Sequence, residues 1–307
     1  MVDITDPIFH DETKAVAHLE ASRWPQGPFC PFCGSFNVHR MGGKTQAGMF
    51  LCNDCRDKFT ARVGSVMERS HIPVHKWLLA MHLMSASKKG VSSKQLQRML
   101  GISYKSAWFL SMRIREAMTP IVGSQGPIGG HGKVVESDET FVGGKKKNVH
   151  RGKPEPKKHA VHALVERGGQ IRVKHVADVT AKTLRQNLVT MASRKSELHT
   201  DDAIAYYWLG KEFAKHKSVN HSQDEYFKDG AGVQSAEAFF AILKRGVYGT
   251  FHSVSEAHLQ KYCNEFAFRW NTRSSLGVED TQRAEEILKG IEGKRLTYRP
   301  TDEAKDA

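Results

Sequence analysis

The sequence lacks the segments that would attach it to a membrane or direct it out of the cell. No run approaches the roughly 18 apolar residues of a membrane span, and the opening stretch MVDITDPIFHDETKAV is acidic, unlike a secretion signal. Acidic residues are also in deficit, since 33 Asp and Glu stand against 46 Lys and Arg, a formal net charge of +13. A balance this basic favours a polyanionic partner. Without a membrane segment, we expect that partner to be nucleic acid.

Cysteine is scarce, and its spacing argues against a disulfide framework. Four of the five cysteines form two Cys-x-x-Cys pairs separated by eighteen residues: Cys30 and Cys33, then Cys52 and Cys55. In a chain without a secretion signal this spacing indicates metal thiolates, because four sulfurs complete the tetrahedron that zinc prefers. We predict one structural Zn²⁺ in a closed site that holds a small β knuckle. The fifth cysteine, Cys263, lies at helical spacing with apolar neighbours and is predicted to be a buried core thiol.

The pattern along the chain changes at several points. Residues 1–66 contain a short helix and then β-like runs around the cysteines, and residues 67–122 are helical. The Gly-rich stretch at 123–133 marks a domain boundary. Residues 133–290 have three consecutive strand patterns and then alternate helix and strand, which predicts an α/β domain with a mixed sheet. The final residues, 291–307, are polar and predict a tail.

Two helical patterns in residues 92–118 predict a helix-turn-helix. Ser92 with Gln95 forms a capping-box signal for the first helix, and Ser103 can cap the second. In this arrangement the second helix exposes side chains of the kind that meet phosphates and base edges: Tyr104, Lys105 and Arg113. The alternative is an ordinary αα-hairpin. A zinc knuckle upstream and a basic chain favour DNA binding.

Three carboxylates lie where a sheet can bring them together. Asp138 follows two valines in a strand pattern, Asp201 closes the strand ELHTD, and Glu237 opens a helix after an interval of thirty-five residues. Mg²⁺ prefers oxygen ligands of this kind. Two metals about 3.5–4 Å apart would clamp the attacking and leaving oxygens of a phosphodiester. Spacing alone leaves three neighbouring acids as alternatives: Glu136, Glu139 and Asp202.

Long motifs extend across nearly the whole chain. They include RWPQGPFCPFCGS, HKWLLAMHLMSASKKGVSSKQLQRMLGISYKSAW, ESDETFVGGK, HTDDAIAYYWLG and AEAFFAILKRGVYGTF. Together they resemble the insertion-sequence transposases that join a zinc ribbon to a DDE catalytic domain of RNase H-like fold, the ISXO-like group. The resemblance implies that Asp138, Asp201 and Glu237 bind two Mg²⁺ or Mn²⁺ ions. One feature departs from the family: His-Thr-Asn often precedes its glutamate, whereas Gly232, Val233 and Gln234 stand here, so Gln234 is an alternative third ligand.

The helix that carries Glu237 also carries two cations. Seven residues place Lys244 roughly 10 Å from Glu237 along the helix axis, which suits a DNA phosphate next to the metals. Arg245 could add a second backbone contact, although both cations also suit a helix C-terminus. The basic insert at 145–159 is either a solvated loop or a track for DNA.

These patterns together predict a DNA transposase. Residues 1–122 would bind the terminal repeats of an insertion sequence, and the α/β domain would hydrolyse a phosphodiester and then join the freed 3′-OH to target DNA. The resemblance implies a homo-oligomer on double-stranded DNA, in the cytoplasm of a bacterium and associated with its nucleoid. Two alternatives stay open: a zinc-ribbon and helix-turn-helix regulator without chemistry, and an RNase H-like nuclease that cuts without joining.

Overall fold

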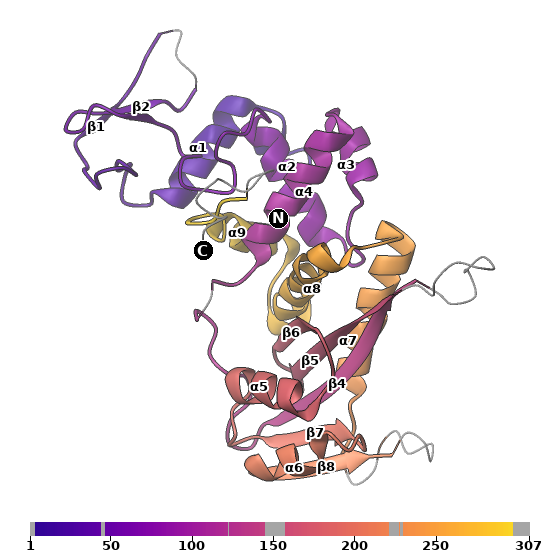
Figure 1. Cartoon of the computed structure of the whole chain (residues 1–307). Helices are drawn as coiled ribbons and strands as arrows, with labels where there is room; N and C mark the ends of the chain where they lie inside the picture. The colour runs from indigo at the N-terminus through magenta and orange to yellow at the C-terminus, as the bar shows by residue number, and fades with distance from the viewer. Residues whose placement is uncertain are drawn as a thin grey trace, which may run out of the picture. The chain divides into compact units, whose positions relative to one another are not determined.

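The chain divides into two units. The computed structural model describes residues 4–43, 47–121, 123–144, 157–220, 227 and 230–296. One unit is Met1–Thr119 together with Val278–Ala307, and the other is Pro120–Gly277 (Figure 1). The break at Thr119 lies close to the Gly-rich boundary that the sequence predicts. The second break differs from the expectation, because residues 278–290 group with the N-terminal part of the chain and not with the α/β domain.

The N-terminal unit begins with a small zinc-ribbon-like element. Its three antiparallel strands are adjacent in chain order: β1 (Val38–Arg40), β2 (Phe50–Cys52) and β3 (Lys58–Phe59). Trp24 packs edge-on against Phe50 and Phe59, with ring centroids 5.6 and 5.9 Å apart. These rings form a small aromatic core that is too small to hold the knuckle by itself, as expected where a metal completes the fold.

The remainder of this unit is helical. Its helices are α1 (Glu12–Arg23), α2 (Val74–Ala86), α3 (Ser93–Leu100), α4 (Tyr104–Met118) and α9 (Asp280–Lys289), with a 3₁₀ turn at Pro7–Phe9. The apolar stripe of α2 is fully buried at Trp77, Met81 and Met84. α9 packs against α1, α2 and α4, which explains why it belongs to this unit. Ile291 is also buried and accepts a hydrogen bond from the Val66 N–H (3.1 Å), so the predicted tail does not begin at residue 291.

The second unit is built on a mixed five-stranded sheet, which confirms the α/β prediction. The strands stand in the order β6-β5-β4-β7-β8. Their bounds are β4 (Val134–Gly143), β5 (Lys158–Glu166), β6 (Ile171–Val176), β7 (Glu197–Asp201) and β8 (Lys215–Val219). β4, β5 and β6 are antiparallel, and β5 turns into β6 through Gly168, whose φ of 74° suits glycine. β7 and β8 then run parallel to β4.

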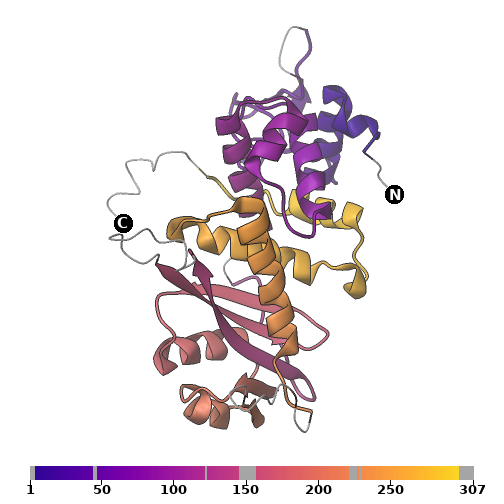
Figure 2. The ribbon, with the colours of Figure 1, turned by 90° about the vertical axis from the view of Figure 1, so that its right-hand side faces the viewer.

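Helices cover both faces of this sheet. They are α5 (Ala181–Met191), α6 (Tyr206–Leu209), α7 (Gln234–Gly246) and α8 (Glu256–Asn271), with 3₁₀ turns at Gly210–Glu212 and Ser274–Leu276 and a π-helical turn at Val247–Phe251. One face packs Val142 and Val161 against α7 and α8, and the buried Cys263 belongs to this core as predicted. The other face packs Val135 and Leu198 against α5 and α6. Figure 2 shows the orange helical segment lying over the first of these faces. Among the helices in the described ranges, none is both long and apolar enough to cross a bilayer.

Candidate metal centres and nucleic-acid interface

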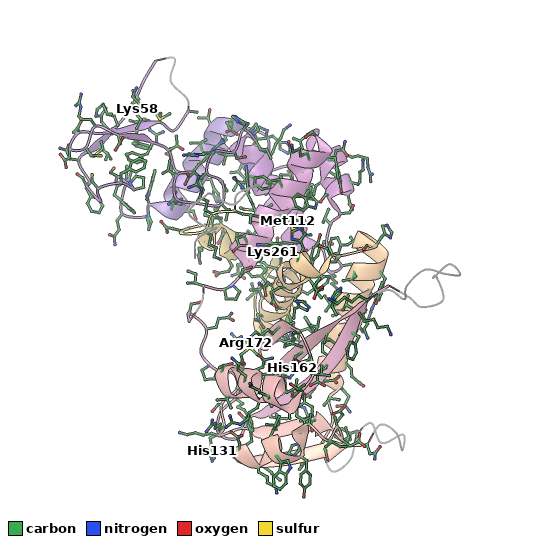
Figure 3. The ribbon with its side chains drawn as sticks, viewed as in Figure 1. Lys58, Met112, His131, His162, Arg172 and Lys261 are labelled. Carbon is green, nitrogen blue, oxygen red and sulfur yellow. The ribbon has the colours of Figure 1, made fainter. Side chains whose placement is uncertain are left out.

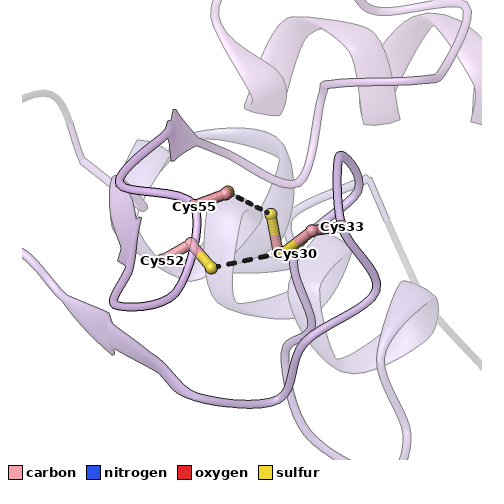
Figure 4. A group of neighbouring side chains, drawn as sticks. All are labelled: Cys30, Cys33, Cys52 and Cys55. Carbon is pink, nitrogen blue, oxygen red and sulfur yellow. Dashed lines mark hydrogen bonds between the residues drawn. The ribbon is translucent and has the colours of Figure 1, made fainter.

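The four cysteines of the ribbon converge on one point. Cys30 Sγ lies 3.6 Å from Cys55 Sγ, and Cys33 Sγ lies 3.5 Å from Cys52 Sγ (Figure 4). All four sulfurs lie within 4.8 Å of one another. A tetrahedral Zn²⁺ with bonds of about 2.3 Å separates its sulfurs by about 3.8 Å, so this geometry fits zinc. The backbone N–H of Cys55 is the main cause that lowers the pKa of the Cys52 thiol to about 7, whereas the pKa of the Cys55 thiol is raised to about 12, with burial as the main cause of the rise.

Asp138 and Asp201 lie on neighbouring strands. β4 and β7 run parallel, with Glu136 beside His199. Side chains two positions apart on a strand share a face, so Asp138 and Asp201 lie on the same face as that pair. It is the face under α7, because the Glu136 carboxylate accepts a hydrogen bond from the Ser235 N–H at the start of that helix (2.7 Å). The structure therefore brings the first two predicted acids together on one face.

Glu237 does not form a ligand cluster with these two acids among the described residues. It is exposed, in the first turn of α7. The rings of Phe239 of α7 and Trp270 of α8 pack together with their centroids 5.9 Å apart. α8 in turn packs along β6 at one edge of the sheet. At 100° per residue, Glu237 and Lys244 occupy the opposite flank of α7, which faces the β7 side. In the described part of the chain, the clusters whose ligand atoms all lie within 4.8 Å do not contain these three carboxylates.

Glu136, one alternative ligand, is occupied by hydrogen bonds that hold the fold together. It is fully buried, and its carboxylate accepts hydrogen bonds from the N–H groups of Ser235 (2.7 Å) and Ala236 (3.2 Å). It also accepts one from the Arg167 guanidinium (2.9 Å). The acid thus caps α7 from outside the helix and carries an ion pair, which leaves little capacity for a metal.

Glu139, a second alternative, points to the opposite face of β4. Its carboxylate accepts a hydrogen bond from the Tyr206 hydroxyl. Burial is the main cause that raises the pKa of Glu139 to about 7; the charges of Asp138 and Asp201 contribute to the rise, and the Tyr206 hydrogen bond opposes it. The charges of both aspartates thus act on a third carboxylate, and a group of acids of this kind suits a divalent cation.

A buried polar network is connected to Glu139 through the Tyr206 hydroxyl. Ser137 shares hydrogen bonds with His162 (2.9 Å) and with Tyr206 (2.9 Å), and Asn187 lies 3.2 Å from the other ring nitrogen of His162. His162 stands in the middle of β5 (Figure 3). Complete burial, and secondarily the charge of Lys174, lower the pKa of His162 to about 3, so the ring is neutral. This network was not predicted from the sequence, although its polar residues at strand positions were a visible signal.

A pocket of about 490 Å³ opens beside Asp201. Asp202, the third alternative acid, lines this pocket with Asp201 and is exposed. Tyr207 and Lys211 also line it. Tyr207 is 62% exposed, its chain neighbour Trp208 is 69% exposed, and the Lys211 ammonium lies 4.1 Å from the Trp208 ring centroid. Exposed aromatic rings with a cation are a surface that nucleic-acid bases can stack on.

The predicted DNA contacts divide into accessible and inaccessible residues. Tyr104 and Lys105 are exposed at the start of α4, and Lys94 of α3 lies 4.7 Å from the Tyr104 ring. The expectation that α4 exposes Arg113 is wrong. The Arg113 side chain is buried and donates to the carbonyl oxygens of Glu68 (2.9 Å) and Leu296 (3.2 Å), because the C-terminal half of α4 is part of the core.

The two cations of α7 differ in their exposure to solvent. Arg245 is exposed and donates from Nε to the Ala241 carbonyl (3.1 Å), while Lys244 is half-buried. Residues 145–156 of the predicted basic insert lie outside the described residues.

Two family comparisons match this chain. Residues 129–271 match the ISXO2-like transposase domain, and residues 10–58 match the transposase zinc-ribbon domain. An uncharacterized protein in the transposable element ISH50 of Halobacterium salinarum is 28% identical over 280 residues, which cover 85% of this chain and 91% of that protein. A crystal structure of a pre-cleavage Mos1 transpososome matches 64% of this chain and 74% of its own, at 16% identity and a TM-score of 0.27, a superposition too loose to define a shared fold.

Proposed function

We propose that this chain, which belongs to the ISXO2-like DDE transposases and carries their zinc ribbon, binds the ends of a mobile element and cuts and joins DNA there. The observation that carries the proposal is the placement of Asp138 and Asp201 on neighbouring strands, on one face, with Glu237 on the adjoining flank of α7. The sheet order, three antiparallel strands followed by two parallel ones, supports an RNase H-like fold for this unit.

The three acids would hold two divalent ions. Carboxylate oxygens are the ligands that Mg²⁺ and Mn²⁺ prefer. The ions, when bound, activate the nucleophile and stabilise the leaving oxygen of the phosphodiester. The chain's own contribution is orientation: Asp138 accepts a hydrogen bond from the Glu139 N–H (2.8 Å), and Asp201 accepts one from the Ala203 N–H (3.2 Å). No covalent protein intermediate is required, so no nucleophilic side chain is assigned.

The N-terminal unit would recognise the ends of the element. Ser92 caps α3 through the Gln95 N–H (3.2 Å), and Ser103 caps α4 through the Ser106 N–H (3.1 Å), as the sequence predicts. Gly101 joins the helices in a left-handed conformation. The exposed first turn of α4 carries Tyr104 and Lys105, and a recognition helix contacts base edges with its N-terminal residues. A helix-turn-helix role for α3 and α4 is therefore the arrangement we propose.

Phosphate contacts beside the metals would come from α7. Lys244 shares the flank of Glu237, two turns further along the helix, and Arg245 is exposed next to it. Both cations would meet the DNA backbone rather than the metal ions. Because each transposition event involves two ends, we propose that the active species is a homo-oligomer assembled on double-stranded DNA, testable by sedimentation of the chain with and without end DNA.

Single amide substitutions of the three acids test the catalytic assignment. Asp138→Asn, Asp201→Asn and Glu237→Gln should each reduce Mg²⁺-dependent cleavage of labelled end DNA by more than about 100-fold, beyond the effect of an outer-shell group. Binding of the same DNA should stay nearly unchanged. Asp202→Asn is the matched control for Asp201, and Glu285→Gln, an exposed helical acid of the other unit, is the control for Glu237. Loss of cleavage in Asp202→Asn but not in Asp201→Asn would reassign the second ligand.

The two alternative functions give different results in the same assays. A regulator without chemistry shows no Mg²⁺-dependent nicking, and Asp138→Asn changes nothing beyond affinity. A nuclease that only cuts releases the element end but never joins a labelled 3′ end to target DNA. Joined products from the wild-type chain exclude both alternatives.

A further inference from the structure

A second cluster of metal-ligating side chains lies on the same unit, away from the three acids. His159 of β5, His175 of β6 and Glu256 of α8 each offer one ligand atom, and these atoms all lie within 4.8 Å of one another. We propose that these three residues bind a zinc ion or another divalent transition metal of similar preference. The site is independent of the transposase assignment.

The sheet register places both histidines on the face that α7 and α8 cover. His159 is paired with Val142, and His175 is paired with Val161. Paired residues on adjacent strands point to the same face, and both valines belong to the core under α7 and α8. The two imidazole rings therefore meet on that face, with centroids 5.8 Å apart and planes at 79°.

α8 is fixed on the edge strand so that Glu256 reaches these rings. The Gln260 side chain accepts a hydrogen bond from the backbone N–H of His175 (2.7 Å) and donates one to the backbone carbonyl of Val173 (3.2 Å). Glu256 is four residues earlier on α8, hence on the same helical face. The Glu256 Oε1 atom lies 3.5 Å from His159 Nδ1. The other carboxylate oxygen, Oε2, lies 2.8 Å from the Lys157 ammonium nitrogen. The carboxylate thus presents one oxygen to the rings and has the other one neutralised.

This geometry and ligand chemistry suit zinc. Zinc bonds of about 2.0–2.2 Å to nitrogen and oxygen separate tetrahedral ligand atoms by about 3.4 Å, which the His159–Glu256 pair already matches. The His175 ligand nitrogen lies at most 4.8 Å from the other two ligand atoms. Bringing it to tetrahedral spacing needs a shift of about 1 Å or slightly more, which a side-chain rotation can supply. Two imidazoles disfavour Mg²⁺ and favour zinc and its neighbours.

The electrostatic setting supports metal binding over a simple ion pair. Burial is the main cause that lowers the pKa of His175, and the neighbouring His159 and Lys157 lower it further, whereas Glu256 raises it. A neutral ring is the form that binds a metal. Three protein ligands leave at least one position for water, so the bound ion would tie the first turn of α8 to the ends of β5 and β6.

The test counts zinc in the full-length chain. The Asp138→Asn background is used throughout, so that zinc at the catalytic acids is not counted, and the chain is dialysed against buffered zinc with excess Mg²⁺. We expect two zinc ions per chain, one in the four cysteines and one here. Glu256→Gln and His175→Gln should each bind one, and the thermal stabilisation by added zinc should shrink with them.

Two controls separate the metal site from the ion pair and from misfolding. Lys157→Met removes the ion pair and keeps the three ligands, so it should still bind two zinc ions. Glu285→Gln changes an exposed helical acid of the other unit and should also bind two. One zinc ion in the background chain itself, two in Glu256→Gln, or one in Lys157→Met would each overturn the proposal.

Discussion

Replacing Glu136 by glutamine tests whether this acid holds α7 in place or binds a catalytic metal. The side chain is fully buried and accepts from two N–H groups of α7, at Ser235 and Ala236, and from the Arg167 guanidinium. Glutamine keeps the volume, but its NH₂ group must face one of these donors. The substitution therefore leaves either the helix end or the guanidinium without an acceptor.

The expected cost follows from these contacts. Hydrogen bonds to a charged group contribute about 1.5–3 kcal/mol, and removing one partner of a buried pair costs about 3–5 kcal/mol. The Arg167 side chain is 36% exposed, so water recovers part of that loss. We expect Glu136→Gln to lower the free energy of unfolding by about 2–4 kcal/mol, equivalent to roughly 4–16 °C in Tm for a unit of this size.

Hydrogen–deuterium exchange is the suitable assay, because two units need not unfold together. Protection should fall in peptides of β4 and α7 and stay unchanged in α1 and α2. Glu212→Gln, which removes an acid from an exposed ion pair with Arg185 (2.5 Å), is the control and should leave the protection of β4 and α7 intact. Wild-type protection in Glu136→Gln would refute the reasoning. If cleavage were also lost, Glu136 would belong to the metal site.

Three further predictions concern the ribbon, the buried network and the DNA contact. Removing zinc with a strong chelator should unfold the knuckle, so exchange should rise in β1–β3 but not in β7 and β8, which do not carry the second zinc site proposed above. Equal rises in these two groups of strands would contradict it. Since burial lowers the pKa of His162 to about 3, the folded chain binds fewer protons than the unfolded chain below pH 6.5. Stability should then fall as the pH drops from 6.5 towards 3, by up to about 1.4 kcal/mol per pH unit, and His162→Gln should flatten this slope in denaturation at several pH values. Lys105→Ala should weaken end binding and reduce its salt slope by about one, while an unchanged slope would exclude a phosphate contact.

Local patterns allowed much of the fold and the ribbon to be predicted from the sequence. Zinc-type cysteine spacing needs only two tight turns, so the four sulfurs meet as expected. The strand patterns led to the mixed sheet. The choice of Asp138 and Asp201 came from the resemblance to DDE transposases. Strand alternation explains why both lie on one face, because a side chain on a strand has only two faces available.

Long-range packing accounts for what the sequence did not reveal. Arg113 has the helical position and chemistry of a DNA contact, but the carbonyl oxygens that bind it belong to residues 45 and 183 positions away. α9 follows the catalytic unit in the chain and packs with the N-terminal unit, which no local pattern encodes. The cluster of His159, His175 and Glu256 depends likewise on strand register and on where α8 docks.

The position of Glu237 has an electrostatic explanation. Two carboxylates brought to 4 Å repel one another by about 4 kcal/mol at an effective dielectric constant of 20, and the charges of Asp138 and Asp201 already act on Glu139. Adding a further carboxylate becomes favourable only when divalent cations share the site, so a flexible acid on the exposed flank of α7 suits the third ligand. Gln234 suits it less: its side chain folds against residue 232, where an added Cβ would lie 2.3 Å from Gln234 Oε1. A neutral amide also gains less from a cation, so Glu237 is the residue that electrostatics would draw to the metals.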